Sequence, residues 1–390
     1  MKTFLGIGAG PIQTGIFVRG AISGGFDRIV LADVDAELVN AVRQTGSITV
    51  NTAGIDGIQR DTWQRIEIYN PMVAEDLKQL IAIATEALVV VTALPSTNFY
   101  RHLPWLREAF AMQPEQRRYV YAAENSTTAA AELCTAVGAF PQTCYLDTVI
   151  GKMSKVFTIE ESDLPPLAPG LNRGHLVEAF NTIYTGSAPD IESVGIVGLY
   201  PKAELEPFEE AKLYGHNAVH FLLGVLAAQK GCRYISEAAH YPELLRLATS
   251  ALRDECGAAL CRKFAGVDPF FTSESYNNYA EELIKRMVSP VLNDSVDRVI
   301  RDLDRKLGWN DRIIGAIRLC LSQNIMPSAL ASGITMTSDI SARWRQETNY
   351  CEAEGMGVMA VIRAQQSYNF AVENTVHFRR YTADKVSVFR

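Results

Sequence analysis

The chain has 390 residues, of which 48% are hydrophobic and 21% charged, a composition typical of globular proteins and unlike disordered, collagen-like or coiled-coil chains. At roughly 100–200 residues per domain, this length predicts two or three domains. The 44 acidic and 37 basic side chains give a net charge of −7, and no block of five basic residues occurs, so we expect no nucleic-acid-binding surface.

The apolar segments and the cysteines indicate neither export nor a membrane span. Glycines and a proline interrupt residues 1–15, and no small-residue cleavage site follows. The longest apolar stretch, residues 80–94, is shorter than the ~20 residues that a bilayer span needs. The seven cysteines are scattered and never spaced as C-x-x-C, which argues against a disulfide framework and a zinc cluster. We therefore expect a reduced, cytoplasmic protein that does not bind membranes.

Short β-branched apolar runs alternate with amphipathic stretches through the first part of the chain. These runs cover residues 3–8, 28–33, 87–94, 118–124 and 144–150. Strands that alternate with helices are typical of a parallel sheet covered on both faces. The sequence therefore predicts an α/β fold, with a Rossmann-type doubly wound sheet domain over residues 1–202.

A glycine-rich turn follows the first run, with Gly8, Gly10 and Pro11 at the start of a predicted helix. Backbone without side chains, next to a helix N-terminus, forms an anion site for a pyrophosphate. Pro11 suits the first helical position, where its missing N–H would have no partner. We assign these three residues and Ile12 to a dinucleotide site. Gln13 departs from the fingerprint, because a third glycine is expected at that position.

The second run ends at Asp33, close to the place expected for the carboxylate that binds the adenosine ribose hydroxyls. Asp35 follows, and two carboxylates there would repel a 2′-phosphate, so NAD is favoured over NADP. Thr92 and Ala93 lie near the end of the third run and Glu124 ends the fourth, and we assign them to the same cofactor site.

The hydrophobic period changes near residue 200. A segment rich in proline and glycine precedes it, and apolar residues then recur mainly at helical spacing. The sequence therefore predicts a mainly α-helical second domain over residues 203–390, which we expect to bind the substrate.

Polar residues cluster just before a long apolar run in this second domain. At about 100° per residue, Lys212, His220 and Asn217 fall at about 0°, 80° and 140°, so they share one side of an α-helix. His216 lies only about 40° from Lys212 and is a competing candidate. A solvated helix face with one hydrogen-bonded histidine would account for the same residues.

The spacing K-x-x-x-x-N-x-x-H resembles the signature of the polyol-specific long-chain dehydrogenases, the mannitol dehydrogenase family. The resemblance extends over nearly the whole chain, with elements in the family's order. These elements are Gly8-Ala9-Gly10, Ala32-Asp33-Val34, Ala123-Glu124-Asn125, Leu146-Asp147 and residues 289–299.

The resemblance implies an NAD-dependent oxidoreductase that acts on a secondary alcohol, and its members are often monomeric. Lys212 would be the general base, and Asn125, Asn217 and His220 would hydrogen-bond the reacting oxygen. An ordinary lysine has a pKa of about 10.4, so burial must lower the pKa of Lys212. This chemistry needs no metal, and no histidine forms a spaced pair with a cysteine. For Asn125, a turn or capping role is the alternative.

A sugar phosphate would require fixed positive charge. A helix predicted over residues 294–307 places Arg298, Arg301 and Arg305 in a basic stripe, although i,i+4 pairs with Asp294 and Asp297 would form a surface salt-bridge ladder from the same residues. We assign Arg301, Arg305 and Lys152 to substrate binding.

The resemblance to the phosphate-specific branch favours interconversion of D-mannitol 1-phosphate and fructose 6-phosphate. The same chemistry on an unphosphorylated polyol or a hexuronate is the alternative. A catalytically silent nucleotide-binding protein is a third hypothesis, suggested by Gln13.

Overall fold

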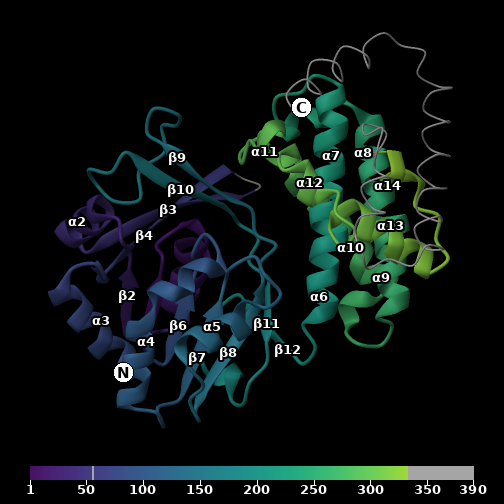
Figure 1. Ribbon diagram of the computed structural model, residues 1–390. Coiled ribbons are helices and arrows are strands. Elements are labelled where there is room, and N and C mark those ends of the chain that lie inside the picture. Colours follow the sequence, from purple (N-terminus) through teal and green to yellow (C-terminus); the bar gives the residue numbers. More distant parts are fainter. Residues whose placement is uncertain (55–56, 333–390) are drawn as a thin grey trace. The chain divides into compact units, whose positions relative to one another are not determined.

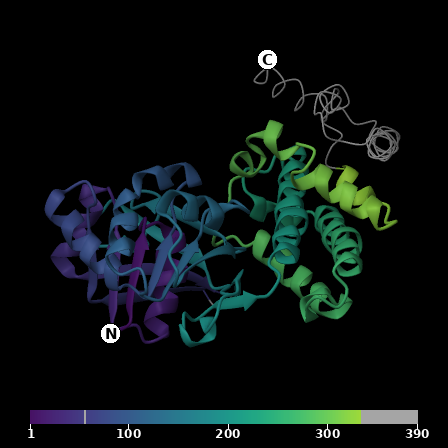
Figure 2. The same ribbon diagram turned by 60° about the horizontal axis from the view of Figure 1, so that its bottom comes forward.

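The computed structural model describes residues 1–54 and 57–332, which form two compact units (Figure 1). The first unit, residues 1–205, is an α/β domain, and the second, which begins at Glu206, is helical. In Figure 2 the first unit is coloured purple to blue-green and the helices of the second teal to yellow. The predicted fold class, a Rossmann-type domain followed by a helical one, is confirmed.

An eight-stranded sheet, in the order β12-β11-β8-β7-β6-β1-β2-β5, forms the centre of the first unit. The six neighbouring strands β8, β7, β6, β1, β2 and β5 are parallel to one another, and β11 is antiparallel to β8. Strand order reverses beside β1, whose neighbours are β2 and β6. The five predicted runs correspond to strands in this sheet. The strands are β1 (Thr3–Ile7), β2 (Arg28–Ala32), β5 (Ile66–Tyr69), β6 (Val89–Thr92), β7 (Arg118–Ala122), β8 (Thr143–Val149), β11 (Ile183–Gly186) and β12 (Leu199–Lys202).

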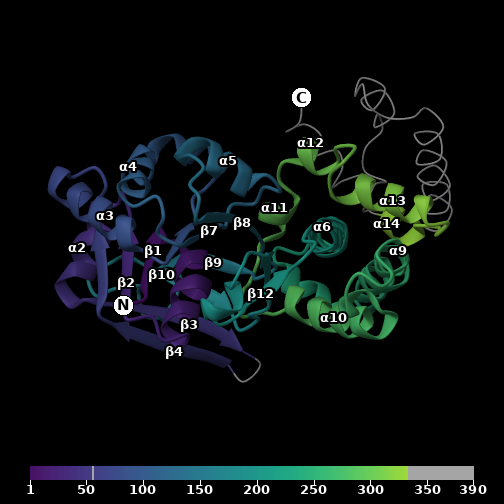
Figure 3. The same ribbon diagram turned by 90° about the horizontal axis from the view of Figure 1, so that it is seen from below.

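Both faces of this sheet are buried, because side chains that alternate along a strand pack into two separate hydrophobic clusters. Phe4 belongs to one hydrophobic cluster and the adjacent Leu5 to the other. The Leu5 cluster packs under α3 (Ala74–Glu86), α4 (Pro104–Met112) and α5 (Ala129–Val137). The Phe4 cluster includes residues of η1 (Gln13–Val18), α1 (Arg19–Ser23) and α2 (Ala36–Thr45). Figure 3 shows α3, α4 and α5 on one side of the sheet.

A second sheet, in the order β4-β3-β10-β9, covers part of the Phe4 face. Its strands β3 (Ser47–Gly54) and β4 (Gly57–Gln64) are an antiparallel pair, and β10 (Arg173–Glu178) joins β3 in parallel and β9 (Ser154–Thr158) in antiparallel. The sequence did not predict this sheet. Strand β4 is mostly polar and exposed, so it has no apolar run that would mark it.

The second unit is built around α7, whose apolar residues are almost all buried. Its α-helical and π-helical elements are α6 (Glu206–Glu210), η4 (Ala211–Asn217), α7 (Ala218–Gln229), α8 (Pro242–Thr249), η6 (Ser250–Gly257), α9 (Ala258–Lys263), α10 (Ser273–Met287), α11 (Val296–Ile300), α12 (Leu303–Lys306), α13 (Arg312–Ser322) and α14 (Ser328–Ser332). Segments η1, η4 and η6 are π-helical. No helix in the described parts of the chain combines the length and the apolar character that crossing a bilayer requires.

The predicted continuous helix over residues 294–307 is wrong. Helix α11 ends at Ile300, Arg301 is extended, and Asp302 has a left-handed backbone with φ of 62° before α12 begins. Helix α11 packs closely on α7, since a Cβ at Gly224 would lie 2.6 Å from Val299 Cγ1. Because the helix is interrupted at residues 301 and 302, Arg298, Arg301 and Arg305 do not form the continuous stripe that one α-helix would give them.

Candidate functional site

The glycine turn after β1 has the geometry that an anion-binding turn requires. Gly8 has φ of +83° and donates its N–H to Ala32 O at 2.8 Å, and a Cβ there would lie 2.7 Å from Ala93 O. A Cβ at Gly10 would meet nothing within 4 Å, so the backbone at Gly10 is open to an approaching group. The helical segment begins at Pro11, with Ile12 as the residue before η1. These residues fit a bound pyrophosphate.

The side chain of Gln13 occupies space that Gly6 of strand β1 leaves free. This side chain is fully buried, and a Cβ at Gly6 would lie 1.9 Å from Gln13 Nε2. Close packing of helix and strand is the function of the fingerprint's third glycine, and here Gly6 provides that space from the strand side. Gly15 allows a second close contact, because its Cβ would lie 2.6 Å from Val177 Cγ1. The space for Gln13 is therefore present, although its buried Nε2 and Oε1 find no hydrogen-bond partner among the described residues.

Asp33 lies at the carboxyl end of β2, against the glycine turn. Its Oδ2 accepts the Ala9 N–H at 2.7 Å and its Oδ1 accepts the Asp35 N–H at 3.0 Å. Asp35 is the N-cap of α2 and accepts from the N–H groups of Glu37 and Leu38. Two backbone donors therefore hold the Asp33 carboxylate at the edge where a ribose would bind.

Glu124 is buried and its carboxylate points into the protein. It accepts hydrogen bonds from Thr92 Oγ1 at 2.9 Å, from Leu94 N at 2.8 Å and from the Tyr100 hydroxyl. Because of these three donors, we propose that Glu124 positions the Thr92–Ala93 strand end and does not bind the cofactor directly. The adjacent Asn125 is exposed beyond the end of β7.

Two buried side chains contact the helical segment that follows the glycine turn. Lys152 Nζ donates to Gly15 O at 3.1 Å, and His175 Nδ1 lies 2.9 Å from Thr14 Oγ1. Burial, together with the nearby Arg173, lowers the pKa of His175 to about 3, so the ring is neutral at pH 7. The Lys152 ammonium is thus engaged by backbone inside the first unit. These contacts do not support the predicted role of Lys152 in substrate binding.

Lys212, His216 and Asn217 lie in the π-helical η4, and His220 follows in α7. An α-helix would separate Lys212 and Asn217 by about 140°. A π-helix closes its hydrogen bonds from residue i to i+5, so residues five apart lie on the same side of the helix. The K-x-x-x-x-N spacing thus brings Lys212 and Asn217 closer to one face than we expected. Nothing in the composition of this segment indicates a π turn.

Burial makes these side chains less basic. It lowers the pKa of Lys212 to about 8, against an opposing effect of Glu209 and with a further lowering by Arg312. Burial also lowers the pKa of His220 to about 4, although Asp294 acts in the opposite direction, and holds the pKa of His216 well below its usual value. Both imidazoles are therefore neutral at pH 7, and each has one N–H to donate.

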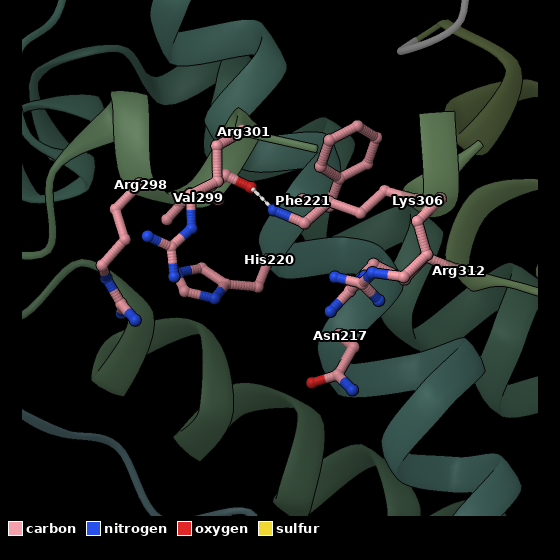
Figure 4. A pocket seen from close by; sticks show the side chains of 9 residues that line it. Asn217, His220, Phe221, Arg298, Val299, Arg301, Lys306 and Arg312 are labelled. Atoms are coloured by element: carbon pink, nitrogen blue, oxygen red, sulfur yellow. Dashed lines mark hydrogen bonds between the residues drawn. The ribbon is translucent and has the colours of Figure 1, made fainter. Parts of the chain in front are cut away.

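A pocket of about 240 Å³ opens beside Asn217 and His220 (Figure 4). It is lined by Asn217, His220, Phe221, Arg298, Val299, Arg301, Arg305, Lys306 and Arg312. In Figure 4 Arg298 lies on the His220 side and Arg312 on the Asn217 side. Five of the nine lining residues are cationic and none is acidic, which is the charge distribution expected for an anionic ligand.

The pocket cations differ in their partners. Arg298 forms a bidentate pair with Asp294, and Arg305 pairs with Asp302 at 2.6 Å. Lys306 donates to Val299 O at 2.7 Å, the dashed line in Figure 4, and burial and neighbouring arginines lower its pKa to about 8. Arg301 is exposed and forms no ion pair with any described residue. The predicted ladder is therefore present at Asp294–Arg298, whereas the charge of Arg301 is not compensated by any carboxylate within residues 1–54 and 57–332.

His220 also has capacity for a ligand. Its Nε2 is buried, lies 3.5 Å from Asp294 Oδ2 and makes no hydrogen bond within the described chain. Over residues 1–54 and 57–332, no group of three or more His, Cys, Asp or Glu side chains is arranged to hold a metal ion.

The sequence identified Asn217, His220, Arg301 and Arg305 among the residues that line the pocket. It placed Arg298 in the basic stripe without assigning it to the substrate, and it missed Lys306, which follows Arg305 in α12, and Arg312, which begins the separate helix α13.

This chain is similar in sequence to known polyol-phosphate dehydrogenases over most of its length. Residues 204–376 match the mannitol dehydrogenase C-terminal domain, and mannitol-1-phosphate 5-dehydrogenase of Bacillus licheniformis is 28% identical over 342 residues, 85% of this chain and 86% of that protein. Mannitol-1-phosphate 5-dehydrogenase of Exiguobacterium sibiricum is also 28% identical, over 88% of this chain and 86% of its own length.

Two solved structures of polyol dehydrogenases share the fold. Mannitol 2-dehydrogenase of Pseudomonas fluorescens, in a ternary complex with NAD and D-mannitol, aligns with a TM-score of 0.64 and 14% identity over 99% of this chain and 94% of that one. Substrate-free D-sorbitol dehydrogenase aligns with a TM-score of 0.66 and 12% identity, over 85% and 78% of the two chains. The likeness to these two structures concerns the fold alone.

Proposed function

We propose that this chain belongs to the mannitol dehydrogenase family and is an NAD-dependent oxidoreductase that interconverts D-mannitol 1-phosphate and fructose 6-phosphate. The observation that carries the proposal is the pocket in which five cationic side chains surround Asn217 and His220. The names of the Bacillus licheniformis and Exiguobacterium sibiricum relatives support the same substrate.

The charge of the pocket favours a phosphorylated substrate over a neutral polyol. Arginine guanidinium groups bind phosphate oxygens in bidentate geometry, and such charge-assisted hydrogen bonds are about twice as strong as neutral ones. Arg301, which has no carboxylate partner among the described residues, is the strongest candidate for this contact, and Arg305 lines the same pocket. A neutral polyol would leave the Arg301 charge without a counterion among the residues that the structure describes.

Lys212 is the proposed general base. Oxidation of a secondary alcohol removes a proton from the hydroxyl, and an amine with a pKa near 8 can accept it at neutral pH, whereas an ordinary lysine is almost fully protonated. Asn217 and neutral His220 are the proposed hydrogen-bonding groups for the reacting oxygen, and the unsatisfied Nε2 of His220 supports this role. Asn125 is assigned to the same group by the family motif.

The first unit is the proposed NAD-binding domain. NAD, when bound, supplies the acceptor for the hydride that leaves the alcohol carbon. Gly8, Gly10 and the helix start at Pro11 would hold the pyrophosphate through backbone N–H groups. Asp33 would accept hydrogen bonds from the adenosine ribose hydroxyls, which favours NAD because a carboxylate there repels a 2′-phosphate.

The test is oxidation of NADH with fructose 6-phosphate, fructose, tagaturonate and fructuronate, repeated with NADPH. We expect turnover with fructose 6-phosphate and NADH, and loss of turnover in Lys212→Ala with NADH affinity unchanged. The exposed Lys285→Ala on α10 is the matched control and should keep full activity. Turnover confined to fructose or a hexuronate would refute the phosphate substrate, and an active Lys212→Ala enzyme would refute the base. NADH binding without any turnover would indicate a silent nucleotide-binding protein.

A further inference from the structure

A cation lies beside the predicted ribose site, and the sequence around β2 contains no sign of it. Arg173 begins β10 of the second sheet, 138 residues after Asp35, and its Nη2 lies 2.5 Å from Asp35 Oδ2. The Arg173 side chain is 37% exposed and that of Asp35 30% exposed, so solvent reaches both groups. The pair is thus accessible to a bound nucleotide.

A continuous set of contacts connects Arg173 to the glycine turn. Ala9 N–H donates to Asp33 Oδ2, Asp35 N–H donates to Asp33 Oδ1, and Asp35 pairs with Arg173. A ribose held at Asp33 would therefore have its 2′ position near Asp35 and Arg173, because Asp35 is the next carboxylate along this edge. In dinucleotide domains an arginine near the acidic residue accommodates the 2′-phosphate of NADP.

We propose that Arg173 is a determinant of cofactor selectivity, held by Asp35 in a state that favours NAD. The inference rests on the proposed nucleotide-binding function. While Asp35 occupies Arg173, the guanidinium charge is neutralised and the carboxylates of Asp33 and Asp35 face the 2′ position. Loss of the Asp35 charge would free Arg173 to pair with a phosphate in bidentate geometry.

Asp35→Asn isolates this effect, since asparagine is as good an N-cap as aspartate and keeps α2 intact. We would measure the dissociation constants of NADH and NADPH by nicotinamide fluorescence, with no polyol present. The wild-type protein should prefer NADH. Asp35→Asn should bind NADPH about tenfold more tightly than the wild type, because the released Arg173 gains one charge-assisted pair with the 2′-phosphate, while NADH affinity changes less than threefold.

The gain must depend on Arg173. Asp35→Asn combined with Arg173→Gln, which keeps a long polar side chain, should return NADPH affinity to the wild-type value. Combination with Arg60→Ala, which removes an exposed cation on β4, should retain the gain. A gain that persists without Arg173, or no gain in Asp35→Asn with NADH still bound, would overturn the proposal. A wild-type protein that binds neither nucleotide would overturn the proposed function as well.

Discussion

Lys212 should set the pH dependence of catalysis. Burial lowers its pKa from 10.5 to about 8, a difference of about 2.5 pH units or roughly 3 kcal/mol between its two protonation states. At pH 7, about one Lys212 in ten is then unprotonated, compared with about three in ten thousand for an unperturbed lysine. The burial of this one side chain is therefore worth about 300-fold in available base at neutral pH.

The assay is kcat/KM for polyol-phosphate oxidation between pH 6 and 10. The rate should rise tenfold per pH unit at low pH and level off above a midpoint near 8, because only the neutral amine accepts the proton. In the reverse direction the protonated lysine donates, so the rate should fall above the same midpoint.

Glu209 provides a check that the titrating group is Lys212. Its charge raises the pKa of Lys212, so Glu209→Gln should move the midpoint to lower pH. The Lys285→Ala control should leave the midpoint unchanged. A midpoint near 10, or one that does not respond to Glu209→Gln, would refute the assignment of Lys212 as a buried general base.

Three further predictions follow from the same structure. Arg301→Ala should raise the KM for fructose 6-phosphate by about 10- to 100-fold, the loss of a charged hydrogen bond, without changing the KM for fructose; exposed Arg246→Ala is the control. The pKa of His175 is lower in the folded than in the unfolded protein, so the unfolded chain binds more protons between about pH 3 and 6.5 and stability rises with pH there. Acidification from pH 7 to 5 should lower the free energy of unfolding, measured by urea denaturation, by about 2 kcal/mol through His175. The variant His175→Gln should lack this contribution to the pH dependence. Gly215→Ala should destabilise by about 1–3 kcal/mol, because its Cβ would lie 2.5 Å from Tyr276 Oη; equal stability would contradict the close packing.

Local sequence determined the frame of this protein. The five apolar runs predicted parallel strands because a strand buried on both faces must be apolar throughout. Gly8, Gly10 and Pro11 marked the turn because backbone conformation there depends on those residue types. The K-x-x-x-x-N-x-x-H spacing identified the polar residues of the second unit through their separation along one helix.

Tertiary structure decided which groups these residues meet. The π-helical geometry of η4 changes the relative directions of Lys212 and Asn217 around the helix. The interruption at Asp302 ends the predicted helix, and the arginines on either side of it line a pocket. Arg173 reaches Asp35 from a strand 138 residues away. Local pattern records period and polarity within a segment, whereas these contacts join segments through packing, and only the folded chain brings them together.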